Sequence, residues 1–168
     1  MDGDGCMEVI YGAAVIDHDG TLLYSARGKL PDGRDAKLGH GDAMHVADID
    51  PDRPGKEIFN VYEEGKNAPY GYALRDAETG KVYFGQYYEG DLGRCMIGDI
   101  ADGVRGLQVW VNDVFDCKGN KLDIPTPSTN MRIFWAGDMT TQLTDGPDYM
   151  GQGASGAAIG RVVTRAVA

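Results

Sequence analysis

A chain of 168 residues is long enough for one domain with a hydrophobic core, and its 42% apolar content excludes a disordered protein. Its 26 acidic and 16 basic side chains give a net charge of −10, which argues against nucleic acid and against an anionic membrane as partners. Three cysteines, Cys6, Cys95 and Cys117, are too few for a disulfide framework and too scattered for a zinc knuckle, so we expect them to be packing residues.

Along the chain, short apolar runs rich in Tyr, Val, Ile, Phe and Trp alternate with Gly- and Asp-containing turns. The runs predict strands within residues 8–16, 21–25, 57–63, 70–74, 81–88, 107–115 and 131–135. Tight turns are predicted at "HDGT" (18–21), "ETGK" (78–81) and "CKGN" (117–120), each with a glycine where a positive φ is needed. No segment before residue 150 shows a helical period with caps, so the sequence predicts an all-β protein.

A repeat is visible in the same pattern. "DIDPDRPGKEIF" begins at Asp48 and "DIADGVRGLQVW" at Asp99, 51 residues later (99 − 48), and each runs into a strand headed by Glu57 or Gln108. A third copy, "MDGDGCMEVIY", opens the chain. A period near 50 residues with several short strands is typical of β-propeller blades, whereas the alternative is an ordinary sandwich with similar turns.

The number of repeats limits what the chain can form. A propeller needs at least about four blades, and residues 1–146 hold about two complete blades and parts of two more. Residues 147–168 differ in character, with small residues and no acid after Asp148, and we expect a disordered or non-native tail there. We therefore expect the chain to be a segment of a longer propeller. The sequence shows no signal peptide.

The acidic loops at the head of each repeat are candidates for metal binding. Asp48, Asp50 and Asp52 stand on alternate positions, where their mutual repulsion predicts a positive partner. Acids at positions 1, 3 and 5, with Glu57 at position ten, predict a calcium site. An EF-hand is excluded because the last acid is not at position twelve and strands flank the loop.

The other two loops match this pattern less completely. The first predicts calcium ligands at Asp2, Asp4 and Glu8, with a missing first ligand upstream. The third retains Asp99 and Asp102 but lacks acids elsewhere, so Asp99 is the weaker ligand candidate there. Turn chemistry, for which Asp-Gly and Asp-Pro pairs suffice, is the alternative for the first two loops and the favoured interpretation for the third.

Candidate catalytic residues lie in "LGHGDAMHVADID" and "EGDLGRCMIGDI". His40 stands between glycines, which allow a close approach to a ligand, and Asp42 and His45 follow. Arg94 occupies the corresponding stretch of the next repeat, so these residues could converge at one end of a propeller. The structural alternatives are a hydrogen-bonded core histidine for His45 and an ion pair with Glu89 or Asp91 for Arg94.

A family resemblance covers residues 1 to about 146. "LGHGDAMHVADIDPDRPGKEIF", "YALRDAETGKVYFG", "DLGRCMIGDI" and "FWAGDMTTQLTDG" resemble, in order, motifs of the rhamnogalacturonan lyases of polysaccharide lyase family 11. The resemblance implies an eight-bladed β-propeller with Ca²⁺ as cofactor. It also implies a secreted, extracellular enzyme that cleaves the rhamnose–galacturonate backbone of rhamnogalacturonan I by β-elimination. We expect a monomeric full-length protein, and a calcium-stabilised propeller that binds carbohydrate or protein without turnover is the alternative.

β-Elimination indicates roles for these side chains. The C5 proton of a galacturonate becomes acidic when Arg or Ca²⁺ neutralises its carboxylate, so we expect Arg94 to provide this charge or to act as base. His40, His45 and Asp42 are expected to bind the uronate, a bridging calcium or the proton. The sequence departs from the family pattern at two places. It has Cys95 where the family usually has Gly, and it has "WAGD" where an acid-Gly-acid run is common in the family.

Overall fold

The computed structural model describes residues 3–134, 141–145 and 161–164. All strand pairs in this part of the chain are antiparallel, and the strands form four sheets and one separate hairpin. The first sheet contains β1 (Val9–Tyr11), β2 (Ala14–Ile16) and β3 (Leu22–Ser25), and the hairpin contains β4 (Arg27–Lys29) and β5 (Asp35–Lys37).

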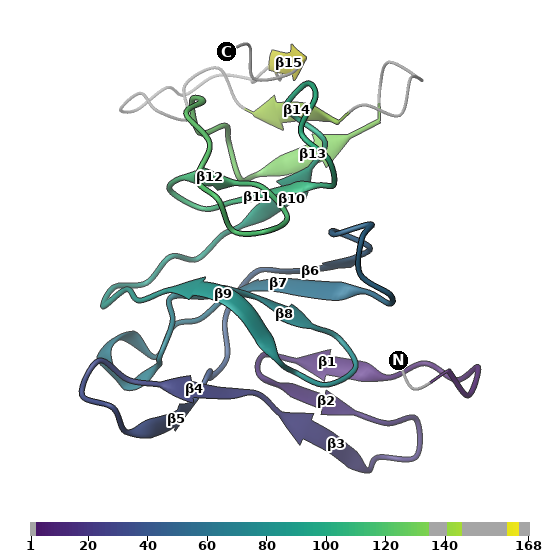
Figure 1. Ribbon diagram of the computed structural model, residues 1–168, viewed down its shortest axis with the longest axis vertical. Coiled ribbons are helices and arrows are strands. Elements are labelled where there is room, and N and C mark those ends of the chain that lie inside the picture. Colours follow the sequence, from purple (N-terminus) through teal and green to yellow (C-terminus); the bar gives the residue numbers. More distant parts are fainter. Residues whose placement is uncertain (1–2, 135–140, 146–160, 165–168) are drawn as a thin grey trace, which may run out of the picture.

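The second sheet has four strands, and the third and fourth have three each. The second contains β6 (Met44–Ala47), β7 (Glu57–Val61), β8 (Tyr72–Asp76) and β9 (Val82–Gln86). The third contains β10 (Met96–Gly98), β11 (Gln108–Trp110) and β12 (Val114–Phe115), and the fourth β13 (Met131–Ile133), β14 (Gln142–Asp145) and β15 (Arg161–Thr164). Figure 1 shows the four sheets following one another in chain order along the long axis of the molecule.

The all-β prediction is confirmed. Within the described residues the only helical element is one turn of 3-10 helix at Gly65–Asn67, and no helix there is long and apolar enough to cross a membrane. Each run predicted as a strand contains one, and two of the runs fold back as hairpins, 8–16 around Gly12 and 107–115 between β11 and β12. The glycines of the three predicted turns have φ of +90°, +74° and +89°, as expected.

The sheets are held together by apolar side chains that fill the space between neighbours. One cluster joins Phe59 and Leu74 of the second sheet to Ile97 and Val109 of the third, and a smaller one joins the first sheet to the second through Ala13 and its neighbours. Trp110 of the third sheet packs with Leu143 of the fourth. Cys95 and Cys117 are buried, as predicted, whereas Cys6 is exposed, so its predicted packing role is wrong.

The predicted repeat is visible as equivalent contacts in two loops. The side-chain oxygen of Glu57 accepts hydrogen bonds from the backbone N–H groups of Ile49 (2.8 Å) and Asp50 (3.1 Å). The amide oxygen of Gln108 accepts from Ile100 (2.8 Å) and from the next N–H (2.9 Å) in the same way. Glu57 and Gln108 therefore make equivalent hydrogen bonds, and each closes the loop that precedes its own strand.

The strand register separates the loops into two groups. Met44 pairs with Asn60, and Val61 pairs with Tyr72, so the loops before β6 and after β7 lie at one end of the second sheet. Ala47 pairs with Glu57 at the other end, where the acidic loop 48–56 lies. Residues 161–164 of the predicted tail form β15, and its remaining residues lie outside the described part of the chain.

Candidate functional site

His40 lies in a loop whose path depends on glycine. A Cβ on Gly41 would collide with the carbonyl oxygen of Val61, and a Cβ on Gly39, whose φ is +91°, would collide with the side chain of Glu64. The glycines beside His40 therefore allow a close approach to the end of β7. They bring the exposed histidine next to the two glutamates that follow this strand.

The imidazole of His40 lies between those glutamates. Its Nδ1 is 3.0 Å from Oε1 of Glu64, and its Nε2 is 3.6 Å from Oε2 of Glu63. The backbone N–H of Glu63 also donates to the carbonyl of His40 at 3.0 Å. Two carboxylates thus orient the ring.

Glu63 is the centre of an acidic group at this end of the sheet. Partial burial and the nearby carboxylates of Asp42 and Asp91 raise the pKa of Glu63, while His40 opposes this shift. Its Oε1 is buried and has no hydrogen-bond partner within the described residues. A buried carboxylate oxygen without a donor is costly, so this position suits a cation.

His45 is a partly buried, hydrogen-bonded histidine, which was the structural alternative to a catalytic role. Its Nε2 lies 3.0 Å from the carbonyl oxygen of Cys95, so the N–H must be on this nitrogen to make a hydrogen bond. Burial lowers the pKa of His45, and the ring is therefore neutral at pH 7. The thiol of Cys95 also contacts the carbonyl of Ala43 at 3.5 Å. These two contacts fix the backbone that carries Arg94.

This contact predicts a pH dependence of stability. Because the pKa of His45 is below 6.5 in the folded protein, the unfolded chain binds more protons as the pH falls through about 6.5, and the folded state loses stability. Between about pH 7.5 and about pH 5.5, the thermal midpoint of the wild type should fall more than that of His45→Gln. Equal falls in the two proteins would show that His45 does not titrate in this way.

Arg94 is exposed at the start of the segment that leads into β10. The structural alternative, an ion pair with Glu89 or Asp91, is not formed. Asp91 Oδ1 accepts from the N–H of Gly93 (2.9 Å), and Glu89 accepts from the hydroxyl of Tyr87 (3.1 Å). Within the described residues the guanidinium of Arg94 makes no hydrogen bond or ion pair. It is therefore available to an anionic ligand.

A hollow of about 500 Å³ opens beside His40 and is within the size range of small-ligand sites. His40 and Glu64 form one side, and residues of the first sheet and β5 complete it: Tyr11, Ala13, Ala14, Ser25 and Lys37, with Gly39. Arg94 does not line this hollow. An aromatic ring, a hydroxyl and a cation around one space are groups that bind acidic sugars.

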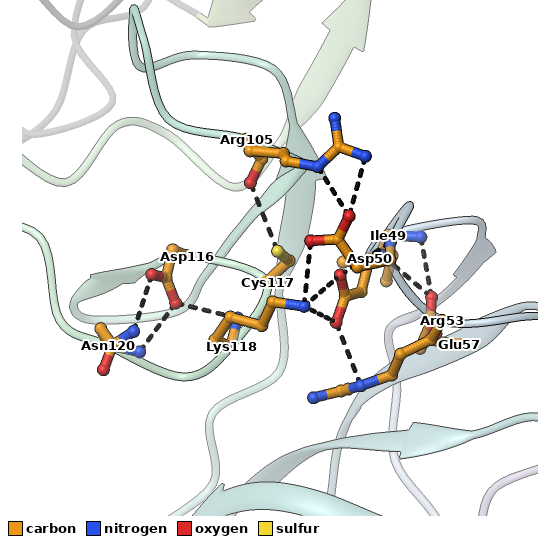
Figure 2. A network of polar contacts seen from close by, with 10 residues as sticks. Ile49, Asp50, Arg53, Glu57, Arg105, Asp116, Cys117, Lys118 and Asn120 are labelled. Atoms are coloured by element: carbon orange, nitrogen blue, oxygen red, sulfur yellow. Dashed lines mark hydrogen bonds and ion pairs between the residues drawn. The ribbon is translucent and has the colours of Figure 1, made fainter.

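The acidic loop at the opposite end of the sheet has a positive partner, as predicted, but the partner is a set of protein side chains. Lys118 Nζ lies 2.7 and 2.8 Å from the two carboxylate oxygens of Asp50, and Arg53 Nε lies 3.0 Å from Oδ2 (Figure 2). Asp50 is fully buried. Although burial opposes the shift, Lys118 and the neighbouring donors lower its pKa.

Asp52 completes this network. Arg105 contacts its Oδ1 at 2.8 Å, and Lys118 lies 3.3 Å from Oδ2, so one ammonium group bridges Asp50 and Asp52. These contacts lower the pKa of Asp52. Lys118 and Arg105 both belong to the third sheet's loops, and the network therefore joins two consecutive repeats.

This arrangement does not fit a calcium ion in the loop 48–57. Three cations face Asp50 and Asp52, and Glu57 uses one oxygen to accept two backbone N–H groups. Asp48 is exposed and, with Asp99, lines a separate hollow of about 320 Å³. We therefore place no metal among Asp50, Asp52 and Glu57.

The ligands predicted in the first loop are only partly described. Asp2 lies outside the described residues, and Glu8 is half-buried directly before β1. The carboxylate of Asp4 accepts the N–H of Cys6 at 2.7 Å and lies 3.3 Å from the ring of His18.

Sequence reasoning missed several of the residues that shape these sites. Glu63 was predicted only as the last residue of the strand run 57–63, and Glu64 lies outside that run, although the acid pair after an apolar run is visible in the sequence. Lys118 and Arg105 could not have been found, because each meets its partner across more than 50 residues (118 − 50 = 68; 105 − 52 = 53).

Comparison with known proteins places this geometry in context. The family model described as rhamnogalacturonan lyase family 11, C-terminal domain, matches residues 1–164. The chain is 44% identical over 147 residues to rhamnogalacturonan endolyase YesW of Bacillus subtilis and 43% identical over 156 residues to rhamnogalacturonan exolyase YesX of the same organism. Each match covers 86% of the chain but only 22% and 24% of the relatives.

Solved structures give the same result. The crystal structure of YesW superposes with a TM-score of 0.75 at 45% identity, over 86% of this chain and 23% of that one. A Bacillus licheniformis rhamnogalacturonan lyase of the PL11 family gives 0.74 at 45% identity, over 86% and 23%. The chain thus spans about a quarter of the length of the curated relatives it matches.

Proposed function

We propose, because the chain belongs to rhamnogalacturonan lyase family 11, that it forms part of a pectin-degrading lyase acting on the backbone of rhamnogalacturonan. The family match over residues 1–164 is the observation that carries this proposal. The exposed guanidinium of Arg94, which has no partner among the described residues, and the hollow beside His40 support it, since both suit an anionic sugar chain.

We also propose that the sheets are blades of a larger β-propeller, of eight blades in the full-length protein. The four-stranded sheet β6–β9 has the composition of one blade, and its neighbours pack on it through the apolar clusters described above. The equivalent loop closures by Glu57 and Gln108 support a radial repeat, because they recur at the same point of two consecutive sheets.

In the proposed reaction the C5–H bond of a galacturonate breaks and its electron pair forms the C4=C5 double bond. The C4–O4 bond breaks at the same time, and O4 leaves with the rhamnose and takes up a proton. Arg94 neutralises the substrate carboxylate, which stabilises the charge that develops next to C5. His40, held between two carboxylates, binds the substrate and supplies or accepts the proton. His45 acts as a positioning residue for Arg94.

We place the proposed calcium ion at the acidic group around Glu63. The carboxylates of Glu63, Asp42 and Asp91 are the oxygen ligands that calcium prefers, and the buried Oε1 of Glu63 needs a positive partner. A bound Ca²⁺ would supply additional positive charge for a uronate carboxylate. His40 would then sit at the border between this group and the hollow.

Chelation tests the calcium proposal. Removal of calcium from the full-length protein should lower the initial rate at least about tenfold, and added calcium, but not magnesium, should restore it. Glu63→Gln should need more calcium for half-maximal rate, whereas Glu78→Gln, at the opposite end of the sheet, should not. Full activity in the chelated wild type would contradict a role for the ion.

The activity itself is tested by ultraviolet absorbance. The full-length protein, incubated with rhamnogalacturonan I and calcium, should produce the absorbance of an unsaturated uronate, which only elimination generates. Binding of the polysaccharide without this absorbance would leave the non-catalytic propeller as the function. A secreted, monomeric parent enzyme completes the proposal, and a polymeric substrate outside the cell is the reason to expect secretion.

A further inference from the structure

Three side chains with metal-binding atoms meet beside the first sheet, away from the proposed active site. One carboxylate oxygen of Asp4, the thiol of Cys6 and one ring nitrogen of His18 all lie within 4.8 Å of one another. All three residues are exposed. The ligand types differ, and together a carboxylate, a thiolate and an imidazole form a set that zinc binds, whereas calcium requires oxygen ligands.

Local contacts hold these groups in place. The N–H of Cys6 donates to Oδ1 of Asp4 at 2.7 Å, so the loop folds the thiol back toward the carboxylate. His18 is fixed from the other side, because Asp17 Oδ1 accepts its backbone N–H at 2.6 Å and lies 2.8 Å from its Nδ1. The same Nδ1 is 3.3 Å from Oδ2 of Asp4. Two separate turns therefore present their side chains to one point.

The dimensions suit a small tetrahedral ion. Zinc–ligand bonds of about 2.0–2.3 Å place neighbouring ligand atoms about 3.3–3.8 Å apart. The three atoms need to approach by at most about 1 to 1.5 Å from the present upper limit of 4.8 Å. Rotation of exposed side chains can achieve this, and water or the carboxylate of Asp17 can supply the fourth ligand.

The equivalent loop of the second repeat has different partners. There, Asp50 and Asp52 are neutralised by Lys118, Arg53 and Arg105, and the sulfur of the neighbouring turn, Cys117, is buried. In the first repeat the loop contributes Cys6, and His18 comes from the turn between β2 and β3 of the same repeat. The second loop thus meets basic side chains, and the first meets softer ligand atoms.

We propose that Asp4, Cys6 and His18 form a binding site for Zn²⁺ or a similar transition metal. The strand register puts β1 residue Val9 opposite Ile16, so this cluster lies at the end of the first sheet that is far from Gly39 and His40. The ion is therefore structural, and it ties the segment before β1 to the turn between β2 and β3. This proposal is independent of the lyase assignment.

Cobalt titration of the full-length protein tests the site. After chelator treatment, Co²⁺ should bind one equivalent with a thiolate-to-cobalt charge-transfer band, and Zn²⁺ should abolish the band, whereas excess Ca²⁺ should not. Cys6→Ser should lose the band, and His18→Gln and Asp4→Asn should weaken cobalt binding. Asp19→Asn removes a neighbouring charge in the same turn and should bind as the wild type does.

Reactivity of the thiol gives a second readout that needs no variant. Cys6 is the exposed cysteine, so Zn²⁺ should protect it from a thiol reagent, while the buried Cys95 and Cys117 stay unreactive with or without metal. A wild type without a charge-transfer band, a band that persists in Cys6→Ser, or a thiol that zinc does not protect would each overturn the proposal. Lyase activity should be unchanged in Cys6→Ser.

Discussion

Replacement of Arg94 by alanine in the full-length protein should lower kcat on rhamnogalacturonan by about 100- to 1000-fold, the usual cost of removing one charge-stabilising donor from an active site. The guanidinium of Arg94 is exposed and has no partner in the described structure, so its removal disturbs no internal contact. The loss should therefore be seen in the rate of unsaturated uronate formation, with the thermal midpoint unchanged.

Two variants make this result specific. Arg94→Lys keeps the charge but not the planar, two-pronged geometry and should recover only part of the rate. Arg27→Ala removes an exposed arginine from β4 and should retain wild-type activity. A rate for Arg94→Ala within about threefold of the wild type would remove Arg94 from the chemistry, because such a difference is below 1 kcal/mol.

Replacement of Asp50 by alanine should produce the largest loss of local stability. Asp50 is fully buried, accepts from Lys118 and Arg53, and joins the second and third sheets. Its removal leaves Arg53 without its carboxylate partner and Lys118 with Asp52 alone. We expect the free energy of opening of residues 48–57 to fall by about 2–4 kcal/mol. Native-state hydrogen exchange of peptides covering 48–57 and 116–121 measures this change.

The matched control is Asp113→Ala, which breaks the exposed pair between Asp113 and Lys121 (2.7 Å) near the same turn. It should cost less than about 1 kcal/mol. Lys118→Met should also increase exchange in the loop, and added calcium should reduce this increase only in that variant, since the ammonium then no longer occupies the space between Asp50 and Asp52. Calcium protection of loop 48–57 in the wild type would contradict the internal ion pair.

Much of the fold was predictable because most of its longer strands coincide with local apolar runs bounded by turn residues. The runs around Phe59, Tyr83 and Trp110 are apolar and β-branched or aromatic, and the turn glycines are explicit. The strands β4, β5, β6, β10, β14 and β15, each of three or four residues, were missed. Their strand conformation is set by pairing with neighbours, which local propensity does not record.

The candidate site was predictable in part. The acid spacing at Asp50 and Asp52 correctly indicated a positive partner, but its identity depended on Lys118, 68 residues further on (118 − 50 = 68). The glycines around His40 were predicted to allow the close approach of a ligand, and in the structure they allow this loop to approach the end of β7. The burial of His45 and its contact with Cys95 favour a structural role over a catalytic one. A single sequence does not show which side chains are buried.

A crystal structure of the full-length protein with a bound rhamnogalacturonan oligosaccharide would test the central claim most directly. We expect the carboxylate of a galacturonate within hydrogen-bond distance of Arg94 and the neighbouring sugar in the hollow beside His40, with the acidic loop 48–57 far from the ligand. An oligosaccharide bound at the opposite end of the sheets, or one that leaves Arg94 in solvent, would contradict the assignment.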